Sequence, residues 1–371
     1  GALAWQTELE KIVVNATPLV TTDRGPRDRA FITDFEGFFD GGAGGILYAI
    51  NVDPFDAQDN PFQPGEIVYQ AALNDGSSGN TPAYDGERVV VASAGNFNAG
   101  TGGSVFAFDP AATDASDAPL WQTSVGGHDG FFGGVSVLGG FAYAATFDFA
   151  GGFSPSRLFK LDADTGAIVY STASNRTSSI PIPLSDDRIA LSTGLPTEGS
   201  VPSLQLYQDD GDSASLLDDT ALATFDDDNG NGFIDSGEFE IFGGYHHQPH
   251  VVDQHPATGG RAAYVGSVNV AGTFFNGYDR ISLIDLTRSF DEPGLVITSY
   301  EGAGSSPAVA GRTLYTLGID RLVGFGEFIP SDEDGSGAVD FFDLTLLLRS
   351  ADTGRPEAAV DLDGDFDAAD V

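Results

Sequence analysis

An alternating, largely apolar strand that ends in aspartate recurs along the chain, and this repeat restricts the fold more than any other feature. Successive units begin about 50 to 65 residues apart, the length of one four-stranded propeller blade with long loops. Alternation indicates that one face of each strand packs against a neighbouring sheet, and the aspartate indicates a turn. The copies are residues 46–53, 105–109, 158–162, 204–209 and 281–285, with a degenerate sixth at 322–325 that lacks the aspartate.

The strand that begins each unit repeats as well, because residues 81–91 match residues 306–315. Weaker copies begin near Thr17, Gly134, Pro181 and Gln248. Residues 4–9 resemble residues 120–125, the last strand of the second unit, whereas the final unit lacks such a strand. We therefore expect an all-β, closed propeller of about six four-stranded blades, with seven as the alternative, in which the N-terminal strand completes the last blade.

Composition excludes several classes of function. The chain carries 55 acidic against 16 basic residues, a net charge of −39, whereas binding to nucleic acid or to an anionic membrane needs a basic surface. It contains no apolar run long enough to span a membrane. Without cysteine there is no disulfide, thiolate metal site or cysteine nucleophile. Hydrophobic residues make up 41% of the chain, which is enough for a large core despite the charge.

Residues 161–170 (LDADTGAIVY) resemble the repeat of PQQ-like β-propellers, in which such a segment docks neighbouring blades. The resemblance covers about residues 4–326 and implies the fold rather than an activity. Family members that carry pyrroloquinoline quinone (PQQ) are dehydrogenases, typically with more blades and far longer chains, and several place an adjacent cysteine pair against the cofactor. Others are non-catalytic scaffolds, such as outer-membrane assembly lipoproteins. Because this chain is short and has no cysteine, we expect no PQQ.

Residues 227–238 (DDNGNGFIDSGE) have the spacing of an EF-hand calcium loop, inside an insertion at about residues 224–242 of the fourth blade. Such a loop needs oxygen ligands at positions 1, 3, 5, 7, 9 and 12 and glycine at position 6. Gly232 occupies position 6, and Ile234 is placed to anchor the loop. The predicted calcium ligands are Asp227, Asn229, Asn231, the Phe233 carbonyl, Asp235 and Glu238. An acidic surface turn is the alternative.

Two further acidic loops lie in residues 329–371, a predicted C-terminal tail that follows the propeller of residues 1–328. The first loop has aspartate at position 12 and a leucine-rich helix after it, which resembles the type I dockerin repeat. The second is about two residues short and has no glycine at position 6, so we expect an incomplete dockerin-like tail, with a plain acidic tail as the alternative. The predicted ligands are Asp332, Asp334, Ser336, the Ala338 carbonyl, Asp340 and Asp343 in the first loop, and Asp361, Asp363, Asp365 and Asp370 in the second.

The choice of acid supports calcium binding, because 42 of the 55 acidic residues are aspartate. Aspartate favours turns and calcium loops, whereas glutamate favours helices. An acidic surface adapted to salty surroundings is the alternative, and both can hold together. We expect calcium to be structural here, since it would neutralise clustered carboxylates and rigidify the loops.

Four of the five histidines lie within ten residues of one another, and the fifth is His128. Loops that lead into the inner strands of a propeller gather on one face, so we expect His128, His246, His247 and His250 to converge there. His255 is expected at the opposite end of its strand. Grouped imidazoles can bind a transition metal. The alternative is a polar loop with hydrogen-bonded histidines.

These features together predict a non-enzymatic extracellular or cell-surface scaffold. Its dockerin-like tail is expected to attach another protein or neighbouring copies of the chain, for instance in a surface assembly or filament. One alternative is a lyase-like enzyme acting on polysaccharide, with a histidine-lined metal site on one face. The other is a propeller that binds a glycan or protein without chemistry.

Overall fold

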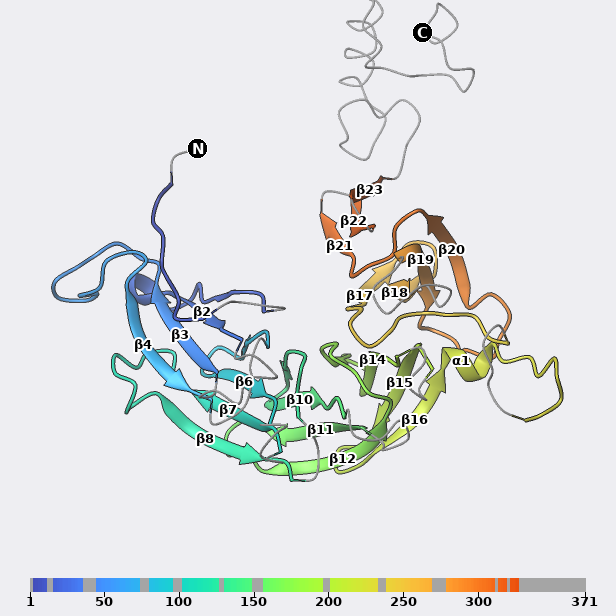
Figure 1. The fold of residues 1–371 in the computed structure, drawn as a ribbon, viewed down its shortest axis with the longest axis horizontal. Helices are drawn as coiled ribbons and strands as arrows, with labels where there is room; N and C mark the ends of the chain where they lie inside the picture. Colours follow the sequence, from blue (N-terminus) through green and yellow to red (C-terminus); the bar gives the residue numbers. More distant parts are fainter. Residues whose placement is uncertain are drawn as a thin grey trace, which may run out of the picture. The chain divides into compact units, whose positions relative to one another are not determined.

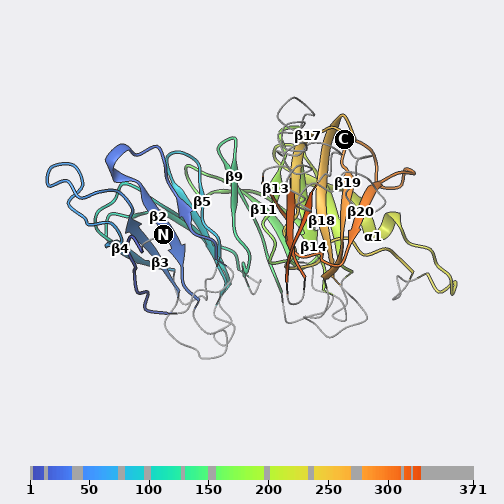
Figure 2. The same cartoon turned by 90° about the horizontal axis from the view of Figure 1, so that it is seen from above.

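In the computed structural model, the described residues form six β-sheets that follow one another along the chain, five of four strands and one of three (Figure 1). Within each sheet the strands lie side by side in sequence order, as Figure 2 shows for the fifth sheet. The chain is a β-propeller of six blades, which confirms the predicted fold class and blade count. The structure describes residues 3–11, 16–35, 45–73, 80–95, 102–126, 130–148, 156–195, 201–232, 238–268, 278–310, 313–318 and 321–326.

The strands have the following bounds. The first sheet consists of β1 (Leu19–Val20), β2 (Arg29–Thr33), β3 (Ile46–Asn51) and β4 (Ile67–Ala72), and the second of β5 (Ala83–Tyr84), β6 (Val89–Ser93), β7 (Ser104–Phe108) and β8 (Pro119–Ser124). The third contains β9 (Ser136–Leu138), β10 (Phe141–Ala145), β11 (Ser156–Asp162) and β12 (Ile168–Ser174), and the fourth β13 (Ile182–Pro183), β14 (Arg188–Thr193), β15 (Ser203–Asp209) and β16 (Ala214–Asp219). The fifth contains β17 (His250–His255), β18 (Gly260–Val268), β19 (Tyr278–Asp285) and β20 (Val296–Glu301), and the sixth β21 (Ala308–Ala310), β22 (Thr313–Leu317) and β23 (Leu322–Gly326). Among the described residues there are two short helices. The helix η1 (Gly25–Arg27) precedes β2, and the helix α1 (Thr220–Ala223) follows β16.

The recurring alternating strand is the third strand of every sheet. In a blade that lies between two other blades, both faces of this strand are buried. In β7, Phe106 and Phe108 pack against the first sheet, whereas Val105 and Ala107 pack against the third. Similar clusters join the third sheet to the fourth and the fourth to the fifth. The expectation of one buried face was therefore too narrow. The alternation in β7 is between large and small side chains, because each face must fit a neighbouring blade.

The aspartate at the end of this strand starts a turn, as predicted. Asp162 accepts hydrogen bonds at Oδ1 from the backbone N–H groups of Asp164, at 3.1 Å, and Thr165, at 2.9 Å. Asp109, Asp209 and Asp285 accept in the same way from the backbone N–H two residues further on. The aspartate therefore satisfies the backbone where the strand turns outward.

The segment that resembles a PQQ-like repeat docks the second sheet onto the third. Trp121 Nε1 donates to the Ala163 carbonyl at 2.9 Å, and Thr123 Oγ1 donates to the Gly166 carbonyl at 2.6 Å. Gly166 has a φ of +72°, and a Cβ there would lie 2.5 Å from Trp121 Cε3. Only glycine meets both requirements.

The N-terminal residues make the same kind of contact with the first sheet, but they do not form the predicted strand. Thr7 Oγ1 donates to the Gly65 carbonyl at 2.6 Å, and a Cβ on Gly65 would lie 2.9 Å from Trp5 Cε3. Residues 3–9 belong to no strand, and the sixth sheet has three strands. The prediction of a paired fourth strand was therefore wrong for the described residues. Residues 3–9 are held by contacts of the Trp5 and Thr7 side chains with Gly65, and not by strand pairing through backbone hydrogen bonds.

The first five sheets belong to one compact unit, Gly1–Pro307 with Thr316–Leu322, and the sites described below lie within it. No helix in the described part of the chain has the length and apolar character needed to cross a membrane.

Candidate functional site

The described half of the predicted calcium loop is folded around Asp227, its first predicted ligand. Asp227 accepts from the backbone N–H of Asn231 at Oδ1, at 3.0 Å, and from that of Gly232 at Oδ2, at 2.9 Å. Asn229 Oδ1 also accepts from the Asn231 N–H, at 2.9 Å. Gly230 and Gly232 have φ values of +71° and +76°. These two left-handed glycines let the backbone curl around the Asp227 carboxylate.

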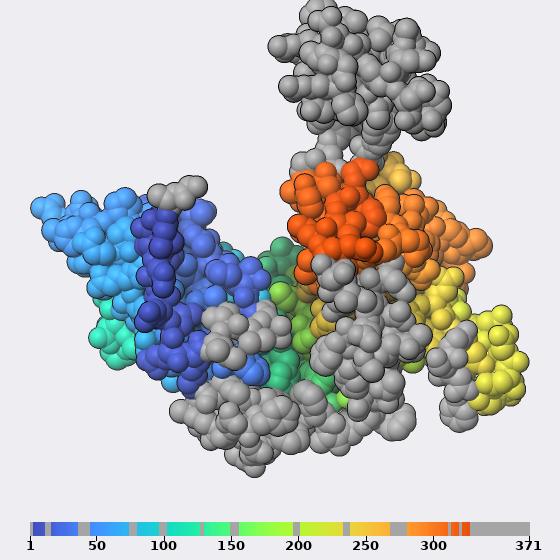
Figure 3. Space-filling model, turned by 45° about the horizontal axis from the view of Figure 1, so that its top comes forward, coloured from blue at the N-terminus to red at the C-terminus, as the bar shows by residue number. Residues whose placement is uncertain are grey.

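The last predicted ligand of this loop closes it from the other end. The Asp226 N–H donates to the Glu238 carbonyl at 2.8 Å, so the two ends of the loop meet. Glu238 is 8% exposed, which is unusual for a glutamate. Figure 3 shows the described residues around this loop in yellow, projecting at the edge of the molecular surface. Phe233 and Asp235 lie outside the described residues, as do both tail loops, at 332–343 and 361–370.

Of the four histidines that were predicted to converge, the structure shows two, His246 and His247, side by side. Their ring centroids are 4.4 Å apart, and the ring centroids of Tyr245 and His246 are 4.3 Å apart. His247 is 0% exposed. His250 begins β17 and His255 ends it, as predicted, whereas His128 lies outside the described residues. Among the residues that the structure describes, no group of three or more histidine or carboxylate side chains is arranged to hold a metal.

Backbone hydrogen bonds fasten this histidine segment to the loop before β13. The Ser178 N–H donates to the Tyr245 carbonyl at 2.6 Å, and Ser179 Oγ donates to the His247 carbonyl at 2.7 Å. Burial lowers the pKa of His246 to about 4 and lowers the pKa of His247 well below its ordinary value. Both rings are therefore neutral at physiological pH.

Acid should destabilise the fold through His246. Because its pKa is lower in the folded chain than in the unfolded chain, the stability that depends on a neutral ring is complete above about pH 6.5 and is lost as the pH falls towards 4. We expect a His246→Gln variant to lose less unfolding free energy than the wild type over this range, by up to about 3 kcal/mol. Urea unfolding at a series of pH values measures the difference, with His255→Gln as the control. Equal pH slopes in wild type and His246→Gln would contradict the assignment.

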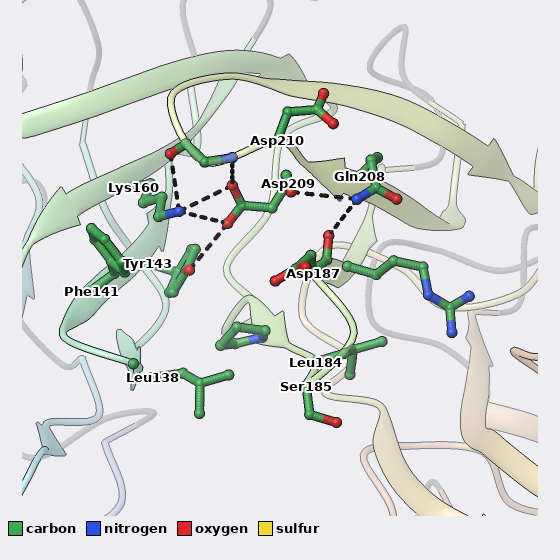
Figure 4. A pocket seen from close by; sticks show the side chains of 14 residues that line it. Leu138, Phe141, Tyr143, Lys160, Leu184, Ser185, Asp187, Gln208, Asp209 and Asp210 are labelled. Carbon is green, nitrogen blue, oxygen red and sulfur yellow. Dashed lines mark hydrogen bonds and ion pairs between the residues drawn. The ribbon is translucent and has the colours of Figure 1, made fainter.

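A second candidate site, which the sequence did not predict, is a pocket of about 660 Å³ between the third and fourth sheets. Its lining comes from the turn between β9 and β10, the inward faces of β10 and β11, the hairpin between β13 and β14, and the end of β15 (Figure 4). The lining residues are Leu138, Gly139, Phe141, Tyr143, Lys160, Pro183, Leu184, Ser185, Asp187, Arg188, Gln208, Asp209, Asp210 and Gly211.

A buried ion pair forms one wall of this pocket. Lys160 Nζ lies 3.0 and 2.9 Å from the two Asp209 carboxylate oxygens, and it donates to the Gly211 carbonyl at 3.1 Å. The ammonium also lies 4.1 Å from the centroid of the Phe141 ring. Tyr143 Oη donates to Asp209 Oδ2 at 3.2 Å, and burial raises the pKa of this phenol, so it remains a donor. Lysine and carboxylate are thus both satisfied by partners within the protein.

One sequence signal marks this ion pair in retrospect. The chain has only two lysines, and Lys160 interrupts the third alternating strand between Phe159 and Leu161. A lysine inside an otherwise apolar strand is rarely buried unless it is paired. Its partner Asp209 lies 49 residues away, in the next repeat. The pairing therefore needs the packing of one blade on the next.

Comparison with known proteins shows the fold alone. No family model and no curated protein matches the chain. Similar solved structures include BamB from Moraxella catarrhalis, with 14% identity over 76% of this chain and 64% of that chain and a TM-score of 0.43. A europium-containing methanol dehydrogenase has 12% identity over 87% of this chain and 56% of that chain, with a TM-score of 0.49. Sqt1 of Chaetomium thermophilum, bound to the N-terminus of the ribosomal protein L10, has 14% identity over 83% and 80% and a TM-score of 0.50. The chain thus spans less than two thirds of the length of the first two proteins.

Proposed function

We propose that the chain is a non-enzymatic, calcium-stabilised β-propeller scaffold that acts outside the cell and attaches to other proteins through its dockerin-like tail. The observation that carries the proposal is the Asp227 carboxylate, whose two oxygens accept hydrogen bonds from the backbone N–H groups of Asn231 and Gly232 in the same loop. Glu238, at the position of the bidentate ligand, is drawn inward at the other end of the same loop.

Calcium would act here through charge. The loop carries four acidic residues within a chain of net charge −39, so each bound ion removes repulsion that opposes the compact state. Since the loop begins shortly after α1 and returns to the polypeptide that leads into β17, fixing it would hold the connection between the fourth and fifth blades. Binding to the folded loop, and not to the unfolded chain, converts calcium affinity directly into stability.

The test measures thermal unfolding of the full chain by calorimetry in calcium and after chelation. At a calcium concentration about 100-fold above the dissociation constant, we expect a stabilisation of about 2.7 kcal/mol. Asp227→Asn and Glu238→Gln should lose most of this increment. Asp228→Asn is the matched control, because it removes the same charge at a loop position that supplies no ligand. Light scattering of the same samples reports whether calcium also promotes assembly.

Two outcomes would contradict the proposal. An unfolding temperature of the wild type that calcium leaves unchanged at low ionic strength would show that no loop binds it structurally. Alternatively, Asp228→Asn could lose as much of the increment as Asp227→Asn. That result would show general screening of acidic charge and not a built site.

A further inference from the structure

The pocket between the third and fourth sheets combines an apolar wall with an acidic edge. Leu138, Phe141 and Leu184 contribute the apolar side, and Leu138 remains 44% exposed at the rim. Figure 4 shows Leu138 and Leu184 on the side of the pocket opposite Asp209 and Asp210. A ligand that fits both sides must have an apolar part and a polar end.

The positive charges of this pocket are already neutralised within the protein. Lys160 is held by Asp209, as described above. Arg188 Nε donates to Asp186 Oδ2 at 2.8 Å, and its Nη1 donates to the Leu286 carbonyl at 2.7 Å. By contrast, no described cation pairs with the carboxylate of Asp187 or of Asp210, which are both exposed. The pocket therefore presents two uncompensated negative charges.

Asp187 occupies the left-handed position of the turn between β13 and β14. Its φ is +59°, and it is the one residue other than glycine with a positive φ in the described part of the chain. The corresponding hairpins of the second and fifth sheets use Gly86 and Gly259 at positive φ. The Asp187 carbonyl accepts from the Asp209 N–H at 2.7 Å and from Gln208 Nε2 at 3.1 Å, which fixes this geometry. In Figure 4 the carboxylate points into the space between Tyr143 and Leu184. The hairpin turn therefore directs the Asp187 carboxylate towards the cavity.

We propose that this pocket binds the side chain of a lysine or arginine from a basic segment of a partner protein. The aliphatic part of such a side chain lies along Leu138 and Leu184, and its charged end pairs with the Asp187 carboxylate. The net charge of −39 attracts a basic segment from a distance. This interaction is independent of the calcium loop and goes beyond the proposed scaffold role.

Fluorescence anisotropy tests the proposal with labelled tetralysine and tetraarginine peptides, capped at both ends, and the full chain in calcium-containing buffer of low ionic strength. The calcium is added so that the acidic loops, which bind it under the proposed function, do not compete for the peptides. We expect at least one peptide to bind and an acetyl-lysine tetrapeptide not to bind. Asp187→Asn should weaken binding about tenfold, the usual size of one charge-assisted contact. Asparagine also tolerates positive φ, so this variant keeps the hairpin.

Asp212→Asn is the matched control, because it removes one exposed charge close to the pocket without lining it. It should leave peptide affinity nearly unchanged. Equal weakening by Asp187→Asn and Asp212→Asn would overturn the proposal in favour of general electrostatic attraction. Failure of both basic peptides to bind would overturn it as well. So would binding of neutral maltotetraose that depends on Asp187, because the pocket would then be a carbohydrate site.

Discussion

Asp209→Asn should lower the unfolding free energy by about 3–5 kcal/mol, because it leaves the Lys160 ammonium buried without a counter-charge. The two side chains are 5% and 8% exposed, so water cannot replace the lost carboxylate. The contacts of Nζ with the Gly211 carbonyl and the Phe141 ring would remain, but they do not neutralise the charge. Urea denaturation, followed by tryptophan fluorescence and circular dichroism, measures the loss.

A double variant separates the buried charge from simple loss of contacts. Lys160→Met combined with Asp209→Asn should recover most of the stability, since neither charge then lies buried alone. Asp164→Asn is the control for an ion pair in water: Asp164 pairs with Arg88 but is 70% exposed, and we expect a loss below about 1 kcal/mol. If Asp209→Asn cost no more than Asp164→Asn, the Lys160 pair would not be buried in solution.

Gly166→Ala should destabilise the fold by about 3 kcal/mol, because it combines a backbone penalty with a steric clash. The residue has a φ of +72°, and the new Cβ would lie 2.5 Å from Trp121 Cε3 and 2.8 Å from Thr123 Oγ1. The second and third blades would have to separate, or Trp121 would have to leave its position. Urea denaturation measures the stability, and tryptophan fluorescence reports whether Trp121 becomes more exposed.

Gly86→Ala isolates the backbone part of this effect. Gly86 has a φ of +97°, but nothing lies within 4 Å of the position of its Cβ, so we expect a cost of about 1 kcal/mol. Gly65→Ala tests the N-terminal contact in the same way, because its Cβ would meet Trp5 at 2.9 Å. A cost for Gly65→Ala like that of Gly166→Ala would establish that residues 3–9 dock in solution. A cost like that of Gly86→Ala would show that they do not.

Much of the fold could be predicted because each repeat carries its own signal. The alternating strands at residues 105–109 and 158–162 correspond to β7 and β11, and the aspartate that ends each of them makes the expected turn. The N-terminal strand could not be predicted correctly in this way. Its resemblance to residues 120–125 reflects the docking contact that Trp5 and Thr7 share with Trp121 and Thr123, and not the backbone pairing of β8.

The candidate sites also differ in how much of each could be predicted from local sequence. The first and last predicted calcium ligands, Asp227 and Glu238, lie within one short loop, and their spacing alone predicts that the two ends of this loop meet, as the Asp226–Glu238 backbone hydrogen bond shows. The histidine segment was recognisable as a cluster, but its sequence did not show that His247 is fully buried. Burial depends on what the next blade places over the ring, and a local pattern carries no information about it.

By itself, the sequence determined the period of the repeat, the number of blades, the turns and the candidate calcium loop, because each depends on residues a few positions apart. Only the tertiary structure decided which charges pair and which remain uncompensated. Lys160 meets Asp209 across the boundary between two blades, whereas Asp187 pairs with no cation among the residues that the structure describes. Contacts between blades depend on how two sheets pack, and this packing joins residues that the chain keeps far apart.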